Sequence, residues 1–481
     1  MNARESHLLT TMEGMAFLDS LETTLFMRIV HHGGHTGVTG SCHQLFLTDT
    51  QSVLVDCGMF QGVDARKRNG EMDIDFPLDG IDGLVLTHVH IDHVGRIPHL
   101  FDAGFNKPIY CTKPTAKMLP IMLEDAMRLG ITRNRQVIKS FLTDLKRLLH
   151  PMKYGEWKSL GGSSQFRFQP AGHILGSAYV EFDHDEERYV FSGDLGSRCT
   201  PILKEPRSPE RADVLVLECT YGDRIHEGRE TRLHRLESIL CETLANHGVT
   251  IIPAFSLGRT QELLFELNMI LEGIGHKTQC SMLKQIDIIV DSPLALKLTD
   301  IYDSMQEFWS EEAHQVLSVD NQPFVFKNLV EVDDGADHRE TVKYLLKSGR
   351  PAVVIAGSGM CTGGRVVDYL KAFLGRETTD VLFVGYQGLG TPGRAIQECS
   401  EGKCAVDLDR MHIDVKAKTY TLTGYSAHAD QSDLIRFVEG IPVKPKEIRL
   451  VHGEEPAKTV LAEKLTALGY QVTWQEPVTE P

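Results

Sequence analysis

The 481-residue sequence has no run of about eighteen uninterrupted apolar residues, the least that a membrane-spanning helix needs. It also lacks the clean apolar start of a signal peptide, because Arg4, Glu5 and Glu13 interrupt that stretch. Ten cysteines lie between Cys42 and Cys404 without a CxxC pair or a dense cluster, which argues against a disulfide framework and against a thiolate zinc site. We therefore expect a cytoplasmic protein with no membrane contact and with reduced, mostly buried thiols.

Excess positive charge is absent as well. The formal net charge is -16, which counts against a protein that holds nucleic acid by its overall positive potential. A nuclease is still allowed, because bound divalent cations concentrate positive charge at one point. With 42% hydrophobic and 24% charged residues, the chain has the composition of a globular protein of two or three domains.

Short apolar runs that end in polar residues recur through the first 220 positions. They occupy residues 25–30, 52–56, 83–87, 189–194 and 213–218. Each run predicts a buried strand whose end delivers polar side chains to one edge of a sheet.

The rhythm changes after Tyr221 to strand, glycine-containing loop and helix. Residues 249–255 precede a helical pattern from Thr260, and similar strands recur at 286–290, 352–356 and 381–384. This alternation is typical of an α/β domain with a parallel sheet. Beyond residue 395 the pattern returns to polar-edged strands and two helices.

The densest group of chemically active residues is Thr-His-Val-His-Ile-Asp-His at 87–93, directly after a predicted strand. His88 and His90 project to the same side of an extended segment because side chains alternate along it. If a helix follows, Asp92 and His93 face a second metal. Imidazole and carboxylate groups are the ligands expected of zinc in an open catalytic site.

Further motifs occur in a specific order around this group. They are Asp56 upstream, His173 in Gly-His-Ile-Leu-Gly-Ser, and Asp194 in Phe-Ser-Gly-Asp. Taken alone, His173 reads as an ordinary packed histidine and Asp194 as a turn residue. In this order and spacing, the set resembles the motifs of the metallo-β-lactamase superfamily.

The resemblance implies an α/β fold, the metallo-β-lactamase αββα sandwich, with two zinc ions. One zinc would bind His88, His90, His173 and a bridging Asp194. The other would bind Asp92, His93, Asp194 and a histidine late in the chain. Asp56 would orient ligand histidines through hydrogen bonds and would not bind metal.

Three later motifs resemble those of the β-CASP nucleases, which carry an inserted α/β cap domain. They begin at Glu218, span 425–430 around His428, and span 450–454 around His452. The resemblance makes His452 the late zinc ligand and favours RNA over DNA as substrate. His428, paired with Glu218, becomes the candidate proton donor, and Asp92 is counted with them among the catalytic residues.

The resemblance divides the chain into four parts. They are an N-terminal extension at 1–24, a first part of the metallo-β-lactamase core at 25–220, the β-CASP domain at 221–395 and a second part of the core at 396–481. The sequence looks like the bacterial and archaeal relatives of the nuclease subunit of the cleavage and polyadenylation specificity factor.

Two glycine-containing junctions between strand and helix lie in the insert. Such junctions expose backbone N–H groups and the positive end of a helix dipole, which suits phosphate. We expect Arg259, Ser358, Gly359 and Arg365 to bind RNA there, although a purely structural turn is an open alternative for each junction.

These observations predict a zinc ribonuclease that hydrolyses single-stranded RNA with a metal-bound hydroxide and leaves 5′-phosphate and 3′-hydroxyl ends. Endonuclease and 5′-exonuclease modes both remain open. A DNA nuclease of the same group, a non-catalytic RNA-binding subunit and a thioesterase of the same core are the alternatives. The oligomeric state is open, with a homodimer among the options.

Overall fold

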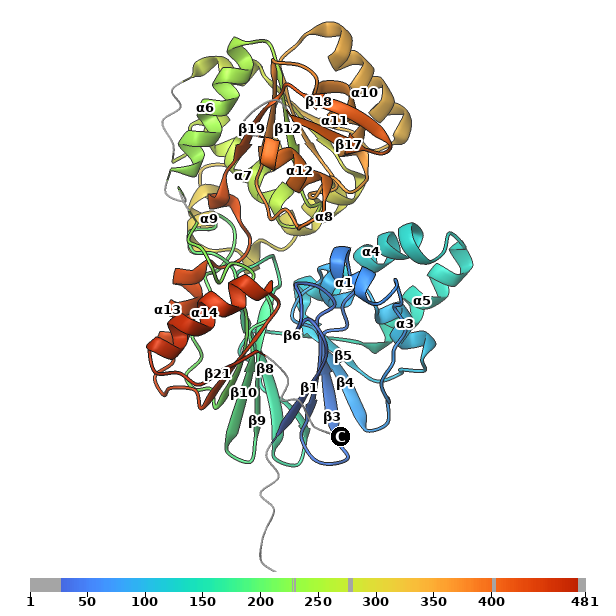
Figure 1. The fold of residues 1–481 in the computed structure, drawn as a ribbon, viewed down its shortest axis with the longest axis vertical. Coiled ribbons are helices and arrows are strands. Elements are labelled where there is room, and N and C mark those ends of the chain that lie inside the picture. The colour runs from blue at the N-terminus through green and yellow to red at the C-terminus, as the bar shows by residue number, and fades with distance from the viewer. Residues whose placement is uncertain (1–26, 227, 229–230, 276–279, 400–403, 475–481) are drawn as a thin grey trace, which may run out of the picture.

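The computed structural model describes residues 27–226, 228, 231–275, 280–399 and 404–474, and the strand counts below refer to these residues. Figure 1 shows two stacked parts, a β-sandwich core below and a cap domain above. The extension expected at 1–24 lies outside the described residues. Among the described residues, no helix combines the length and the apolar character needed to cross a bilayer.

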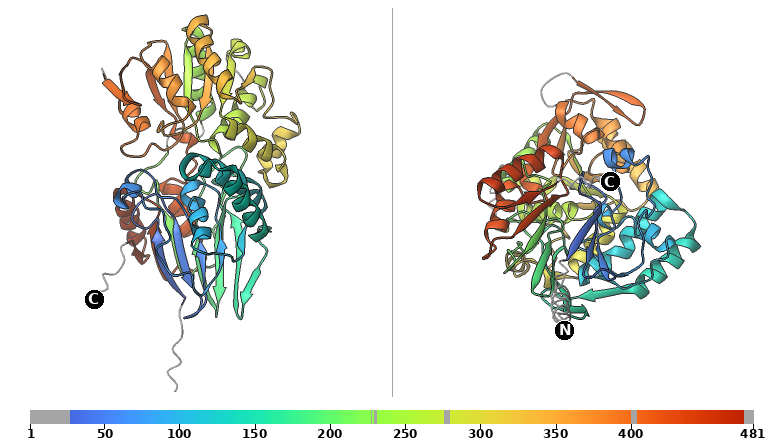
Figure 2. Two further views of the ribbon diagram at one scale, coloured as in Figure 1. Left: turned by 90° about the vertical axis from the view of Figure 1, so that its right-hand side faces the viewer. Right: turned by 60° about the horizontal axis from the view of Figure 1, so that its bottom comes forward.

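Two sheets packed face to face form the core, as the second view shows (Figure 2). Within the described residues the first sheet has six strands in chain order: β1 (Arg28–Gly33), β2 (Cys42–Phe46), β3 (Ser52–Val55), β4 (Ile81–Val85), β5 (Ile109–Thr112) and β6 (Leu149–Met152). The second has seven in the order β21-β20-β11-β10-β9-β8-β7: β7 (Lys158–Gly161), β8 (Ser164–Pro170), β9 (Ala178–His184), β10 (Glu187–Phe191), β11 (Val214–Glu218), β20 (Glu447–Val451) and β21 (Val472–Thr473).

Helices cover the outer faces of both sheets (Figure 1). Those beside the first sheet are α1 (Gly62–Lys67), α2 (Ile91–Val94), α3 (Ile97–Asp102), α4 (Lys113–Ala126) and α5 (Arg135–Leu148). Those beside the second sheet are α13 (Gln431–Glu439) and α14 (Glu455–Ala467). The predicted αββα sandwich is confirmed.

Alternation along the strands explains why the sheets are buried on both faces. In β11, Val214 and Val216 pack between the two sheets, whereas Leu215 and Leu217 pack under α13 and α14. Successive side chains of a strand point to opposite faces, so an unbroken apolar run supplies two cores at once.

The cap domain is built on a parallel sheet. Within the described residues it has six strands in the order β14-β13-β15-β12-β16-β19: β12 (Val249–Pro253), β13 (Asp287–Asp291), β14 (Leu329–Glu331), β15 (Ala352–Ala356), β16 (Thr379–Phe383) and β19 (Lys418–Thr421). Its helices are α6 (Arg232–Ala245), α7 (Arg259–Glu272), α8 (Pro293–Asp303), α9 (Glu311–Leu317), α10 (Gly335–Ser348), α11 (Arg365–Phe373) and α12 (Pro392–Glu398), and β17 (Cys404–Leu408) pairs with β18 (Met411–Val415).

The strand pairing of the cap sheet extends past residue 395, the predicted end of the cap. β19 pairs in parallel with β16, so the chain stays with the cap through Thr421. The sequence Lys-Thr-Tyr-Thr is polar because β19 is an edge strand with exposed and half-buried side chains. The polar-edged strands of the core have a similar pattern, so only the pairing partner distinguishes an edge strand of the cap from a strand of the core.

The expectation of reduced thiols is wrong for one pair. Cys399, at the end of α12, forms a disulfide with Cys404, the first residue of β17. Their separation of five positions is not a CxxC motif, so that motif could not have marked the pair. Most free cysteines are buried, as predicted: Cys42, Cys57, Cys111, Cys219 and Cys361.

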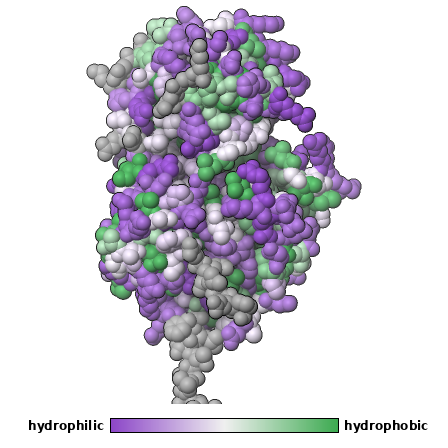
Figure 3. Space-filling view, in the orientation of Figure 1, coloured by the Kyte–Doolittle hydropathy of each residue, from purple (hydrophilic) through white to green (hydrophobic). Residues whose placement is uncertain are grey.

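The cap docks on loops of the core near the predicted site. The N–H of Leu175 donates to the hydroxyl of Tyr302 in α8 at 3.0 Å, and the N–H of Ser310 donates to the carbonyl of Ile202 at 2.8 Å. An indentation in the outline to the right marks the junction, and hydrophilic and hydrophobic residues are mixed around it (Figure 3).

Trp309 anchors this docking region. Its ring is 1% exposed, lies 5.6 Å from the ring of Phe324, and donates from Nε1 to the carbonyl of Tyr302. We expect Trp309→Ala to lower the free energy of unfolding by about 3–5 kcal/mol, because it leaves a cavity in a packed region. Urea unfolding of both proteins measures this. The half-exposed Trp157 is the matched control, and equal losses for the two alanine variants would contradict the packing argument.

Candidate metal centre

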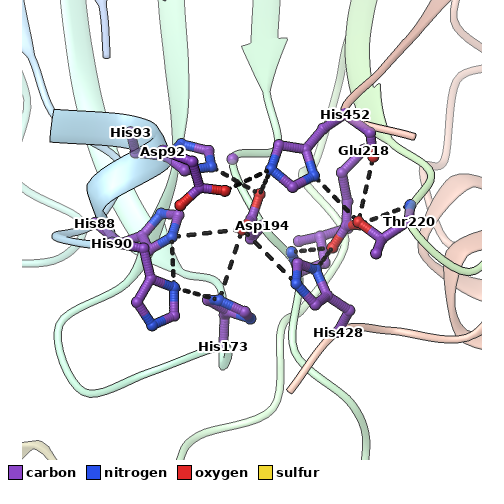
Figure 4. A network of polar contacts seen from close by, with 12 residues as sticks. His88, His90, Asp92, His93, His173, Asp194, Glu218, Thr220, His428 and His452 are labelled. Atoms are coloured by element: carbon purple, nitrogen blue, oxygen red, sulfur yellow. Dashed lines mark hydrogen bonds and ion pairs between the residues drawn. The ribbon is translucent and has the colours of Figure 1, made fainter. Parts of the chain in front are cut away.

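The predicted ligands meet at one edge of the sandwich, where core strands end (Figure 4). They come from segments far apart in the sequence. His88 and His90 follow β4, Asp92 and His93 lie in α2, His173 follows β8, Asp194 follows β10, Glu218 ends β11, His428 precedes α13 and His452 follows β20. The parallel pairing of β10 with β11 and of β11 with β20 brings three of these segments together.

Asp194 lies at the centre of the cluster. Its Oδ1 is 3.2 Å from Nε2 of His93 and 3.6 Å from Nε2 of His452. Its Oδ2 is 3.4 Å from Nε2 of His88 and 3.6 Å from Nε2 of His173. One buried carboxylate thus faces histidines of two groups, which is the arrangement that the predicted bridging role requires.

Ligand atoms fall into groups compact enough for a cation. One group is His88, His90, His173 and Asp194, and another is Asp92, His93 and His452, each with its atoms within 4.8 Å of one another. A third consists of Asp194, Glu218 and His428. The structure therefore brings all seven predicted ligands together, and it offers His428 as a competing ligand.

Hydrogen bonds fix which ring nitrogen faces the centre. Asp56 lies 2.7 Å from Nδ1 of His93 and accepts from the N–H and hydroxyl of Thr87. Thr220 Oγ1 lies 3.1 Å from Nδ1 of His452, and Thr87 Oγ1 lies 3.1 Å from Nδ1 of His88. Partners of this kind orient an imidazole and leave Nε2 for the metal. Sequence reasoning identified Asp56 but missed both threonines, whose only signal is adjacency to a ligand or motif residue.

The backbone has positive φ values where two of the core strands end beside the cluster. Asp56 and His452 have φ values of 61° and 50°, a left-handed conformation that residues other than glycine seldom adopt. Such conformations concentrate at functional sites. Gly193 lets the loop before Asp194 approach the metal edge, since a Cβ there would lie 2.7 Å from Cβ of Thr87.

Burial controls the protonation of the first group. It lowers the pKa of His88 to about 3 and that of His90 to about 4, and it holds the pKa of His173 well below its usual value. These rings are therefore neutral near pH 7 and keep a lone pair for a metal.

His93 and Asp194 behave as a charged pair. Burial disfavours the charged form of His93, but Asp194 and Asp56 outweigh it and raise its pKa well above the usual value. Burial likewise opposes ionisation of Asp194, and His452, His93 and His88 outweigh it and lower its pKa. A cation bound beside Asp194 would take over the role of the proton on His93, so metal binding releases that proton.

The donor set fits divalent metal. Within the described residues, the buried atoms His93 Nε2 and Asp194 Oδ1 face each other at 3.2 Å inside the cluster, and neither makes a hydrogen bond of normal geometry. Three imidazole nitrogens also converge, with His90 Nδ1 at 3.2 Å from His88 Nε2 and 3.0 Å from His173 Nε2. Nitrogen and carboxylate donors without thiolate suit zinc in an open site.

His428 and Glu218 form a pair at the rim of the cluster. Nδ1 of His428 is 3.1 Å from Oε1 of Glu218, and Nε2 is 4.0 Å from Oδ2 of Asp194. Burial acts against the charged imidazole, but Glu218 and Asp194 outweigh it and raise the pKa of His428 to about 9. Glu218 is itself held by the N–H groups of Leu195 and Thr220. The pair therefore presents a proton toward the metal edge.

The residues expected to bind RNA differ in their surroundings. Ser358 is partly exposed and Gly359 is buried, and both lie on the loop after β15. Arg365 bonds Asp291 at 2.6 Å and the carbonyl of Val332, and its side chain is 21% exposed.

Arg259 does not fit the expected RNA contact. Its side chain is 4% exposed and paired with Glu262 inside the protein. The local turn pattern suggested a phosphate site, but packing of the cap against the core covers the guanidinium.

Family models match three successive parts of the chain. The metallo-beta-lactamase superfamily matches residues 24–232, the Beta-Casp domain matches 260–396, and the Zn-dependent metallo-hydrolase RNA specificity domain matches 412–474.

Several characterised proteins are similar over most of the chain. Ribonuclease TTHA0252 of Thermus thermophilus is 36% identical, over 93% of this chain and 98% of its own. Transcription termination factor FttA of Methanocaldococcus jannaschii is 30% identical, over 89% of this chain and 67% of its own. A solved structure of a protein of unknown function from Enterococcus faecalis has a TM-score of 0.55 at 12% identity and covers 94% of this chain and 98% of that one, which supports the fold alone.

Asp56 offers a test of the hydrogen bonds behind the ligands. We expect Asp56→Asn to weaken the binding of divalent metal by about 10–100-fold, because the amide supports the His93 tautomer poorly. Competition with a chromogenic chelator measures the affinity. Asp82→Asn, at an exposed position of β4, is the control, and unchanged affinity in Asp56→Asn would contradict the orienting role.

Proposed function

The chain belongs to the β-CASP branch of the metallo-β-lactamase superfamily, and on that basis we propose that it is a zinc-dependent ribonuclease. The observation that carries this proposal is the Asp194 cluster with the His428–Glu218 pair at its rim. A non-catalytic subunit would not need this complete set of converging donors. A thioesterase of the same core would need neither the cap nor the His428 pair.

Two zinc ions are the proposed cofactor. One would be held by His88, His90, His173 and Asp194, and the other by Asp92, His93, Asp194 and His452. The compact groups of donor atoms support this assignment. Zinc bound in such a pair activates water and neutralises the charge of a phosphodiester.

The protein's own residues supply orientation and a proton. Asp194 and Asp92 supply negative charge that would offset the charge of two bound cations. His428 donates a proton from Nε2 to the departing 3′-oxygen, which is a poor leaving group without it. Glu218 fixes the tautomer of His428 through Nδ1 and balances its charge. Hydrolysis in this way leaves 5′-phosphate and 3′-hydroxyl ends.

Single-stranded RNA is the proposed substrate. The match to an RNA specificity domain, the histidine at 452 and the ribonuclease among the relatives support it. Ser358, Gly359 and Arg365 are the proposed contacts, since they lie at the carboxyl end of the cap sheet, where loops bind ligands in parallel α/β folds. A DNA nuclease of the same group is the second candidate.

We propose domain limits that follow the pairing of strands: core from about residue 25 to 220, cap from 221 to Thr421, and core again to the end. The extension at 1–24 is assigned no function. A cytoplasmic location and a homodimer stay predictions.

The first test of function joins metal content to substrate choice. We expect about two zinc ions per chain by elemental analysis, and chelator-sensitive cleavage of labelled single-stranded RNA much faster than of DNA of equal sequence. RNA binding should weaken as salt rises, because contacts to phosphate are local. Equal turnover of DNA would favour the DNA nuclease, and a metal-free protein after zinc supplementation would reject the proposal.

His428 gives a sharper test of the chemistry. We expect His428→Ala to lower kcat on RNA by about 10²–10⁴-fold, the usual contribution of general acid catalysis, while both zinc ions and RNA affinity are kept. Glu218→Gln should lose less and move the alkaline limb of the pH–rate profile to lower pH, because the carboxylate raises the pKa of His428, which must be protonated to act as the acid. Loss of one zinc in His428→Ala would make this residue a ligand.

A further inference from the structure

The segment that carries His428 is held from two sides. On the core side, the hydroxyl of Ser197 contacts the carbonyl of Ser426 at 3.0 Å and that of His428 at 2.6 Å. The N–H of Ala429 donates to the carbonyl of Leu195 at 2.7 Å. These contacts hold the backbone of Ser426, His428 and Ala429 from the core side, and the residues before Ser426 have other partners.

The cap holds the preceding residues through two arginines. Arg259 donates from Nη1 to the carbonyl of Tyr425, and Arg232 donates from Nη1 to the carbonyl of Gly424 at 3.3 Å. Each arginine is the first residue of a cap helix, α7 for Arg259 and α6 for Arg232. Adjacent carbonyls of one short turn thus receive donors from the first residues of two different helices.

Both guanidinium groups are buried and paired. Their side chains are 4% and 6% exposed. Arg259 lies 2.5 Å from Glu262, and Arg232 lies 2.8 Å from Glu266. The two glutamates are four residues apart on α7 and therefore share a face. Two positive and two negative charges form a compact network between the cap helices and the 424–425 turn.

This network is a costly way to stabilise a protein. A cation in the first turn of a helix opposes the helix dipole, and here that occurs twice. A buried ion pair is often matched or exceeded in stability by apolar residues of similar volume. A planar guanidinium does offer what an apolar side chain cannot, a fork of donors that bonds a carboxylate and a carbonyl in fixed geometry. We therefore infer that the arginines serve to fix the geometry of the 424–425 turn rather than to stabilise the fold.

We propose that Arg232 and Arg259 are positioning residues, which hold the carbonyls of Gly424 and Tyr425 and thereby set the place of His428 at the metal centre. This inference rests on the proposed function of His428 as proton donor. Only two residues separate Tyr425 from His428, so a displaced turn moves the imidazole relative to Glu218 at 3.1 Å and Asp194 at 4.0 Å. A displacement of about 1 Å can cost about 10²-fold in rate.

The test compares two substrates on zinc-loaded protein. The leaving 3′-oxygen of RNA needs a proton. Bis(p-nitrophenyl) phosphate instead releases p-nitrophenolate, a stable anion that needs none. Arg259→Lys keeps a charge beside Glu262 but lacks the fork that reaches Tyr425. We expect it to lower kcat on RNA by about 10–10²-fold with unchanged KM, zinc content and turnover of the phenyl ester. Arg232→Lys should act in the same way through Gly424.

A double variant shows whether the effect passes through His428. In the His428→Ala background, Arg259→Lys should lower kcat on RNA by less than about twofold, because residues that act as a unit are not additive. Arg350→Met is the matched control, since that cap arginine is exposed and pairs only loosely with Asp287. If the lysine variant does not fold, Arg259→Met combined with Glu262→Leu removes the pair as a unit and gives the same comparison.

The outcomes separate this inference from the proposed function. Equal losses on both substrates, or a full loss added to His428→Ala, would overturn the positioning role. A normal RNA rate in Arg259→Lys beside a low rate in His428→Ala would overturn it too, while leaving the proposed function intact. A normal RNA rate in His428→Ala would instead contradict the proposed proton donor.

Discussion

A carboxylate inside the protein, that of Asp194, determines how the surrounding residues are arranged. Five histidine rings place a nitrogen within 4.0 Å of its oxygens: His88, His93, His173, His428 and His452. A buried charge without compensation is strongly unfavourable, so the site must supply positive charge from protonated rings or bound cations. The other elements of the core can be understood as the means of delivering these histidines to one carboxylate.

The sandwich makes this delivery possible because its strands end at a common edge. β10, β11 and β20 run in parallel, so the residues that follow them, Asp194, Thr220 and His452, emerge side by side. β4 of the first sheet contributes the histidine-rich turn from the facing side. Apolar side chains on both faces of these strands keep the edge rigid, and the left-handed residues Asp56 and His452 turn the chain sharply where the strands stop.

The fold class and the set of converging residues could be predicted from the sequence because both depend on local sequence patterns. Alternation marks the strands, and a period of two places His88 and His90 on one side. It was less reliable where the answer depends on tertiary packing. The polar strand β19 was assigned to the core because its pairing with β16 cannot be recognised from the local sequence. Arg259 was assigned to phosphate binding because its burial against Tyr425 cannot be recognised there either. The pairing of Cys399 with Cys404 was missed for the same reason.

The order of residues along the chain distinguishes the proposed zinc ligands from the Glu218–His428 pair. Six of the seven proposed zinc ligands precede the cap in sequence, and they are held by core strands and by Asp56, Thr87 and their neighbours. The proposed proton-donating pair is different, because Glu218 ends the strand before the cap and His428 lies just beyond its last strand. The whole cap is thus inserted between the two partners of one 3.1 Å contact.

A rigid-body shift of the cap would move the turn at Gly424 and Tyr425, and with it His428, while leaving most of the metal ligands in place. In the proposed mechanism, proton transfer is therefore the step most sensitive to how the cap docks.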